Sequence, residues 1–198
     1  EVYGSALYLP IDEKHPLQPQ SPYSASKISA DNISMSYFNS FDLPVSIIRP
    51  FNTYGPRQSS RAVIPTIASQ IISSKKIKLG NVHTMRDFTY VSDLCNAYEV
   101  IVKSKKFVGD IVNVGSNNYV SIAELYSKIQ KILKSKKTFS QVSERVRSTK
   151  SEVDKLLCDN TKILQLTNWK PKISLDNGLK KTLTWIKKNK SIYKDYLY

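Results

Sequence analysis

The order of one helix, one buried strand and one proline-rich loop over residues 21–57 constrains the fold more than any other feature of this sequence. Ser21-Pro22 is typical of a helix start, with serine as the N-cap and proline as the first helical residue. A helix is therefore predicted from Tyr23 to about Ser40, and Asp42-Leu43-Pro44 ends it. The β-branched run Val45-Ser46-Ile47-Ile48 follows, and such runs are typical of buried parallel strands.

The loop after this strand is the first candidate site. It reads Arg49-Pro50-Phe51-Asn52-Thr53-Tyr54-Gly55-Pro56-Arg57. Open α/β sheets bind their ligands at the carboxyl ends of the strands, which is where this loop is expected to lie. The pattern predicts an α/β protein with a binding site at the loop.

The rest of the chain alternates in the same way. Short strands are predicted at residues 77–79, 86–91 and 110–115, and helices at 63–73, 92–103, 160–166 and 175–188. Another helix begins after Ser121, where Glu124 stands at the capping-box position. These elements are sufficient for a globular domain of 198 residues with 40% hydrophobic residues.

Charge and composition exclude several function classes. The net charge is +14, but the lysines recur at helical spacing, as on solvated helix faces, and no basic stripe interleaves with aromatic residues. We therefore expect no nucleic-acid binding. No apolar run is long enough to span a membrane and the N-terminus does not resemble a signal peptide, which predicts a cytoplasmic protein. Cys95 and Cys158 fit neither a disulfide framework nor a metal site, and His15 and His83 are expected at the surface.

Tyr23 and Lys27 are the candidate proton-transfer pair. Residues four apart lie one turn from each other on the same helix face, so the ammonium can approach the phenol. A free phenol has a pKa of about 10, and a nearby cation and the positive end of a helix both lower such a value. The spacing alone is uninformative in a chain with 12 tyrosines. The position of the Tyr23–Lys27 pair just inside a capped helix, before a buried strand and an Arg-Pro-Phe-Asn loop, makes the pattern specific.

This combination closely resembles the extended short-chain dehydrogenase/reductase family, and in particular its sugar-nucleotide epimerases and dehydratases. The resemblance runs from Glu1 to about Lys188 and includes Glu1-Val2-Tyr3-Gly4, which is similar to a family motif. It implies NAD as cofactor, a nucleotide-diphosphate sugar as substrate and a homodimer when full length. It further implies that the chain is a C-terminal fragment, inactive alone because the family's glycine-rich phosphate-binding turn would lie upstream.

The resemblance also implies a division into two domains. Residues 1–57 and 88–115 correspond to the remainder of a Rossmann-type NAD-binding domain with a parallel sheet. Residues 58–87 and 116–198 correspond to a smaller α/β domain that binds the sugar nucleotide. In the family, the backbone around Pro50 and Phe51 would line the nicotinamide, together with Tyr23 and Lys27.

Glu1 indicates the reaction type within the family. Dehydratases and decarboxylases tend to carry glutamate before Val-Tyr-Gly, whereas many 4-epimerases carry a small or hydroxyl residue. Once C4 of the sugar is a ketone, the C5 proton is acidic and a carboxylate can remove it. The resemblance thus implies a 4,6-dehydratase with Tyr23 as the base at C4 and Glu1 as the base at C5. A UDP-glucuronate decarboxylase, with Arg61 at the extra carboxylate, and a UDP-sugar 4-epimerase stay open, as does a basic non-catalytic binding module.

The substrate-binding residues are carried over from the same resemblance. Arg86 matches the arginine that binds the diphosphate, with a salt bridge to a nearby carboxylate as the alternative. Arg147 is the second candidate cation, although Ser148 replaces the usual proline. Asn52 matches the asparagine that contacts the diphosphate and sugar. The segments containing Val63 and Leu79 match those around the nucleobase or are simply core.

Short matches at residues 60–65, 86–89, 151–153 and 158–160 narrow the resemblance further. They are similar to the dehydratases of bacterial legionaminic-acid-type pathways. That similarity implies a nucleotide-linked N-acetylglucosamine as substrate. The choice of nucleotide among UDP, GDP and dTDP stays open.

Overall fold

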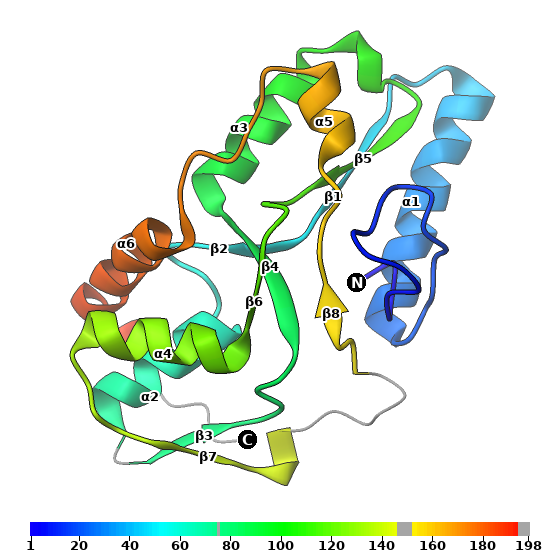
Figure 1. The fold of residues 1–198 in the computed structure, drawn as a ribbon. Helices are drawn as coiled ribbons and strands as arrows, with labels where there is room; N and C mark the ends of the chain where they lie inside the picture. The colour runs from blue at the N-terminus through cyan, green and yellow to red at the C-terminus, as the bar shows by residue number, and fades with distance from the viewer. Residues whose placement is uncertain (75, 146–151, 194–198) are drawn as a thin grey trace.

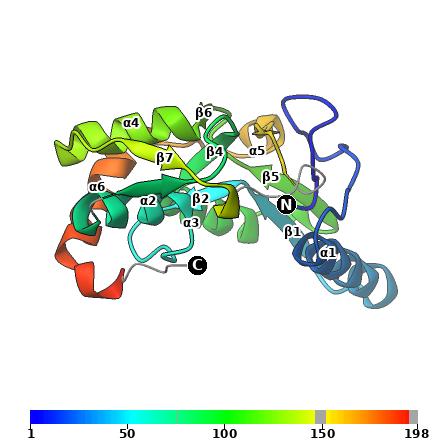
Figure 2. The same cartoon turned by 90° about the horizontal axis from the view of Figure 1, so that it is seen from below.

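The computed structural model describes residues 1–74, 76–145 and 152–193. Helices and short, mostly parallel strands are interspersed along this chain, and β6 is the antiparallel one (Figure 1). Figure 2 shows helix α1 and the N-terminal loop at one end of the molecule, with helices α2, α4 and α6 at the other. The central strands β1, β2, β4 and β5 lie between these two ends.

Helix α1 (Pro22–Phe41) begins and ends where its sequence predicts. The side chain of Ser21 accepts a hydrogen bond from the backbone N–H of Ser24 at 3.0 Å. Asp42 ends the helix in the left-handed region, with φ 52°. The chain then enters β1 (Ser46–Pro50), which pairs in parallel with β5 (Asp110–Val114).

A hydrophobic cluster covers one face of this pair of strands. Its side chains come from helix α3 (Val91–Val102), the 3₁₀ turn Lys105–Phe107, strand β5 itself, helix α5 (Thr161–Leu166) and the segment after α5. The buried members are Ala97, Ile101, Phe107, Val112, Val114, Ile163 and Trp169. The indole N–H of Trp169 donates to the carbonyl of Asp93, so the segment after α5 is fixed to the start of α3.

Strand β4 (Met85–Tyr90) is the centre of a second sheet. Its C-terminal half pairs in parallel with β2 (Asn52–Tyr54), and its N-terminal half pairs with β6 (Tyr119–Ser121) and β8 (Lys155–Leu156). A two-stranded parallel sheet joins β3 (Ile77–Leu79) to β7 (Phe139–Gln141). The strand β2 lies in the segment that the sequence predicts as a loop, so that prediction is wrong over these three residues.

The largest core joins helices α2 (Val63–Ser73), α4 (Ile122–Leu133) and α6 (Leu175–Lys188) to β3 and β4. The predicted capping box of α4 is present, because Glu124 and Ser121 bond to each other's backbone N–H groups. The predicted bounds of α2, β3 and α6 are confirmed. Two further 3₁₀ turns span Ser143–Arg145 and Lys190–Ile192. Among the described residues, no helix is long and apolar enough to cross a membrane.

The N-terminal loop packs onto the rest of the chain through a small third cluster. Val2, Tyr3, Ile11, Phe51 and Cys158 form it, and Ile11 makes backbone bonds to residues 157 and 159.

His15 belongs to this loop and is only 2% exposed, so its predicted surface position is wrong. Its Nε2 atom accepts the N–H of Leu7 at 2.9 Å, and its ring lies against Tyr3 and Tyr8. The sequence gives no sign of this burial because one partner is a loop backbone. His83 is exposed, as predicted.

Candidate functional site

A cavity of about 930 Å³ opens where the N-terminal loop, the ends of β1 and β2, helix α2 and strand β4 meet. It brings together most of the residues that the sequence singles out. Those that line it are Glu1, Tyr23, Pro50, Phe51, Asn52, Arg61, Val63, Leu79 and Arg86. Lys27 lies outside its lining, beside Tyr23, and Arg147 lies outside the described residues.

Tyr23 and Glu1 meet at one end of the cavity. Tyr23 is the second residue of α1 and is 58% exposed. The Lys27 ammonium nitrogen lies 5.5 Å from the centroid of the Tyr23 ring, on the side of the helix that the four-residue spacing predicts. Ser24 Oγ donates to the carbonyl of Glu1 at 2.8 Å, which ties the Glu1 motif to the first turn of α1. A smaller cavity of about 330 Å³ is also lined by Glu1 and Tyr23.

Two side-chain amides in the wall carry unpaired oxygens. Asn52 Oδ1 and Gln58 Oε1 are buried and have no hydrogen-bond partner among the residues that the structure describes. Gln58 Nε2 donates to the carbonyl of Thr53 at 2.8 Å, which fixes the orientation of that amide. A buried acceptor without a donor is costly, so both oxygens favour a bound ligand or water at this wall. Sequence reasoning missed Gln58, because one glutamine in a loop carries no signal.

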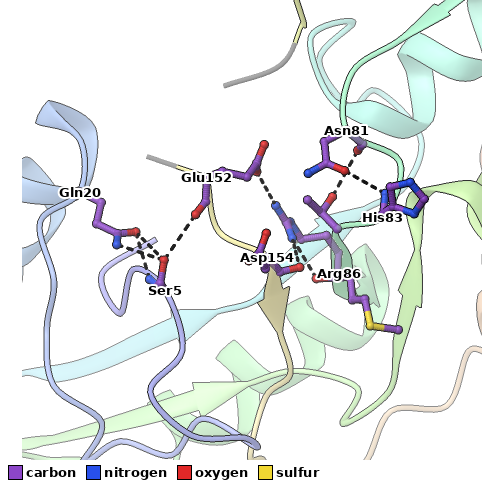
Figure 3. Close-up of polar contacts among 9 residues, drawn as sticks. Ser5, Gln20, Asn81, His83, Arg86, Glu152 and Asp154 are labelled. Carbon is purple, nitrogen blue, oxygen red and sulfur yellow. Dashed lines mark hydrogen bonds and ion pairs between the residues drawn. The ribbon is translucent and has the colours of Figure 1, made fainter. Parts of the chain in front are cut away.

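Arg86 lies in the cavity wall within a network of polar contacts (Figure 3). Its Nη2 atom is 3.5 Å from Glu152 Oε1, and both side chains are 15% exposed. Its Nη1 atom donates to the carbonyls of Met85 at 2.9 Å and Asp154 at 3.3 Å. Arg86 therefore lines the cavity and also forms the salt bridge that the sequence analysis names as the alternative, while its role at a diphosphate stays a prediction. Glu152 is a further lining residue that the sequence did not single out.

Ser5 connects this network to the N-terminal loop. Its hydroxyl donates to the backbone carbonyl of Glu152 at 3.4 Å and to Gln20 Oε1 at 3.2 Å (Figure 3). Gln20 immediately precedes Ser21, the N-cap of α1. The arginine and tyrosine ends of the cavity are therefore joined by side-chain contacts.

The ionisable lining is mainly cationic. Among the described residues, the charged groups that line the cavity are Arg49, Arg61, Arg86, Arg145, Glu1 and Glu152. Such an excess of guanidinium groups favours an anionic ligand, and guanidinium pairs well with phosphate oxygens. Arg145 was missed from the sequence; its Nη1 atom donates to the carbonyl of Lys78 at 3.2 Å.

Val63 and Leu79 lie where the cavity meets the largest core. Leu79 is 4% exposed within that core and Val63 packs against it, while both also line the cavity. The two alternatives considered from the sequence, core and binding wall, are thus compatible at these positions.

Comparison with known proteins shows the family to which this chain belongs. The family described as GDP-mannose 4,6 dehydratase matches residues 1–182. The chain belongs to this family. The resemblance to sugar-nucleotide dehydratases and epimerases of the extended short-chain dehydrogenase/reductase type is confirmed, as is the α/β Rossmann-type fold.

Individual relatives in this family include both dehydratases and epimerases. The dTDP-D-glucose 4,6-dehydratase of Mus musculus is 32% identical over 192 residues, which is 96% of this chain and 54% of the relative. The UDP-glucuronate 4-epimerase of Thermodesulfobacterium geofontis is 32% identical over 178 residues, which is 89% of this chain and 53% of the relative. The chain spans about half the length of these relatives.

Solved structures of the family superpose closely on the chain. The dTDP-glucose 4,6-dehydratase of Bacillus anthracis in complex with NAD matches with a TM-score of 0.87 and 33% identity, over 96% of this chain and 60% of that one. The UDP-glucuronic acid 4-epimerase of Bacillus cereus, in complex with UDP-glucuronic acid and NAD, matches with a TM-score of 0.87 and 28% identity, over 95% and 59%.

Proposed function

We propose that this chain forms part of an NAD-dependent nucleotide-sugar 4,6-dehydratase. The observation that carries the proposal is one cavity in which a carboxylate, Glu1, and an exposed phenol, Tyr23, face the same space as Asn52 and Arg86. The family membership and the dehydratases among its relatives support it.

In this proposal, the residues fit a nicotinamide at the Tyr23 end of the cavity. Tyr23 leaves more than half of its surface accessible, and the Pro50–Phe51 segment lines the same space. NAD bound there would supply the acceptor for a hydride from C4 of the sugar and the donor for its return to C6. Tyr23, as the phenolate, takes the proton of the C4 hydroxyl and becomes the neutral phenol, and the ammonium of Lys27 stabilises the phenolate before the transfer.

Glu1 then acts on the oxidised sugar. With a ketone at C4, the C5 proton is acidic, and the Glu1 carboxylate removes it as the C6 hydroxyl leaves. The proton taken from C5 and the hydroxide lost from C6 together make one molecule of water. Return of the hydride to C6 and of the Tyr23 proton to C5 would give a 4-keto-6-deoxy sugar nucleotide, with the cofactor and the Tyr23 phenolate restored to their starting states.

The opposite end of the cavity holds the nucleotide in this proposal. Arg86 binds the diphosphate, and Asn52 contacts the diphosphate and the sugar through its amide. Val63 and Leu79 flank the nucleobase. Arg147 is proposed as a second diphosphate cation. The proposed sugar is N-acetylglucosamine.

The proposed domain division assigns residues 1–57 and 88–115 to the NAD-binding part and residues 58–87 and 116–198 to the sugar-nucleotide part. The cavity lining contains residues from both parts, which supports a ligand bound between them. We further propose that the full-length protein is a homodimer, which light scattering would test.

A 4-epimerase is the second candidate, because relatives with that name match over most of this chain. A test on the full-length gene product separates the candidates. The protein is incubated with UDP-, GDP- or dTDP-linked N-acetylglucosamine or glucose, or with UDP-glucuronate. Mass spectrometry gives the mass of each product, and NMR gives its configuration at C4. A product lighter by one water, without net NADH, is expected. An unchanged mass with inverted C4 would indicate an epimerase, and loss of carbon dioxide from UDP-glucuronate a decarboxylase.

A further inference from the structure

Arg49 is a buried cation of the cavity lining and has no role in the proposed chemistry. It is 7% exposed at the end of β1, next to Pro50. Its Nε atom donates to Asp31 Oδ2 on α1 at 2.8 Å, and its Nη1 atom donates to the Tyr3 hydroxyl at 3.0 Å. One side chain thus joins the strand, the helix and the Glu1-Val2-Tyr3-Gly4 segment.

The position of Asp31 on α1 makes this contact relevant to the proton-transfer pair. Tyr23, Lys27 and Asp31 follow one another at a spacing of four, so they lie along one face of the helix. Lys27 therefore has a phenol one turn before it and a carboxylate one turn after it. An ammonium and a carboxylate at this spacing attract each other. In the structure Lys27 lies over the Tyr23 ring, while Asp31 is bonded to Arg49.

Burial strengthens the Arg49 contacts. Burial alone lowers the pKa of Arg49, but bonds to Tyr3 and Asp31 outweigh it and the pKa is raised. Burial raises the pKa of Tyr3, which keeps its hydroxyl protonated, and that hydroxyl donates to Asn113 Oδ1 at 2.6 Å. Arg49 is thus a permanent cation with two fixed acceptors.

We propose that Arg49 is a positioning residue that occupies the Asp31 carboxylate, so that Lys27 serves Tyr23, and that holds the Glu1 segment through Tyr3. This inference rests on the proposed function of Tyr23 as a base. Without Arg49, the Asp31 carboxylate attracts Lys27 away from the phenol and adds an uncompensated negative charge to the same helix face. Both effects disfavour the phenolate.

The charged and titratable groups around this face come from three elements. They are Lys27 and Asp31 on α1, Arg49 on β1, and Glu1, Tyr3 and Glu13 in the N-terminal loop. The experiment therefore removes the two members of one ion pair separately and together, while every other group stays in place.

The test uses the full-length gene product and the pH profile of kcat/KM for the sugar nucleotide that the enzyme turns over. Arg49→Met is expected to move the rising limb of the profile to higher pH by about one unit. The double variant Arg49→Met/Asp31→Asn is expected to return it toward wild type, since the competing carboxylate is gone. Asp31→Asn alone is expected not to move the rising limb to higher pH. A purely structural role predicts lower melting temperatures with the limb unmoved, and that result would overturn the inference.

Two controls complete the design. If Arg49→Met does not fold, Arg49→Gln removes the charge while keeping a hydrogen-bond donor for Tyr3 and is held to the same expectation. The inference would also be refuted if the rising limb of Arg49→Met/Asp31→Asn stayed at the higher pH of Arg49→Met. Tyr23→Phe separates the two proposals. If this variant stays active, the proposed function fails. If it loses activity while the pH profile of Arg49→Met matches that of the wild type, only the positioning role of Arg49 is rejected.

Discussion

At the scale of single residues, Tyr23 stands where the first backbone N–H groups of α1 lack intrahelical acceptors, close to the positive end of the helix dipole. Lys27 adds a second positive charge from one turn further along. Together they make this tyrosine the best-placed phenol of the cavity for accepting a proton. Tyr3, the other tyrosine in the lining, is buried and bonded to Arg49 and Asn113.

Tyr23→Phe is expected to lower kcat by about 10²–10⁴-fold, the range for losing a general base. KM should change little, since the hydroxyl acts mainly in the transition state. Steady-state kinetics of the full-length gene product measure both constants. Wild-type turnover in this variant would contradict the proposed role.

The Arg86–Glu152 ion pair leads to a second prediction at this scale. If Arg86 binds the diphosphate, Glu152 competes for the same guanidinium at 3.5 Å. Glu152→Gln is therefore expected to tighten UDP, GDP or dTDP binding by about fivefold, the size expected for one partly exposed ion pair. Isothermal titration calorimetry measures the affinity.

The unphosphorylated nucleoside is the matched ligand for this test. Its affinity should not change in Glu152→Gln, because it offers Arg86 no anion. Weaker diphosphate binding in the variant would indicate instead that Glu152 itself contacts the ligand.

At the scale of elements, the site depends on the N-terminus of α1. Ser21 caps the helix, Ser24 Oγ bonds to the carbonyl of Glu1, and Tyr23 lies between them. The first turn therefore sets the distance between the two proposed bases. A change that loosens this turn should affect catalysis as well as stability.

Ser21→Ala is expected to cost about 1 kcal/mol of stability through the lost N-cap. It should also lower kcat, because the first turn of α1 carries Tyr23. Ser174→Ala is the matched control, since Ser174 caps α6 in the same way and lies outside the cavity lining. Urea unfolding and kinetics on both variants should give similar stability losses, with lower kcat only for Ser21→Ala. Equal kcat values in the two variants would refute the proposed dependence of catalysis on the first turn of α1.

At the scale of the whole molecule, Asp87 joins segments that are far apart in sequence. It is fully buried on β4, and burial raises its pKa, while hydrogen bonds from the chain oppose that shift. Oδ1 accepts the N–H and hydroxyl of Ser116, and Oδ2 accepts the N–H groups of Asn117 and Cys158. Both carboxylate oxygens are thus used to fix the turn after β5 and the segment after β8.

Asp87→Asn is expected to destabilise the protein by about 2–4 kcal/mol, because its NH₂ group would face N–H donors in a buried position. Chemical denaturation measures the loss. Ser116→Ala, which removes only the hydroxyl bond, should cost about 1 kcal/mol. A loss for Asp87→Asn no larger than that of Ser116→Ala would contradict this role of the carboxylate.

The sequence by itself determined the local elements. Caps at Ser21 and Ser121, the left-handed stop at Asp42 and the apolar periodicity of α2 and α6 act within one or two turns, so they can be read directly. The sequence also determined the family, through motifs whose residues are close along the chain, and most of the site residues that it singles out line the cavity.

Only the tertiary structure decided which distant groups meet. The strand β2 forms because β4 offers it a parallel partner, and His15 is buried because Tyr3 and a loop backbone enclose it. The bonds of Arg49 to Asp31 and Tyr3, and that of Arg86 to Glu152, span 18 to 66 positions. Contacts of this kind depend on how the sheets and helices pack, and no local pattern encodes them.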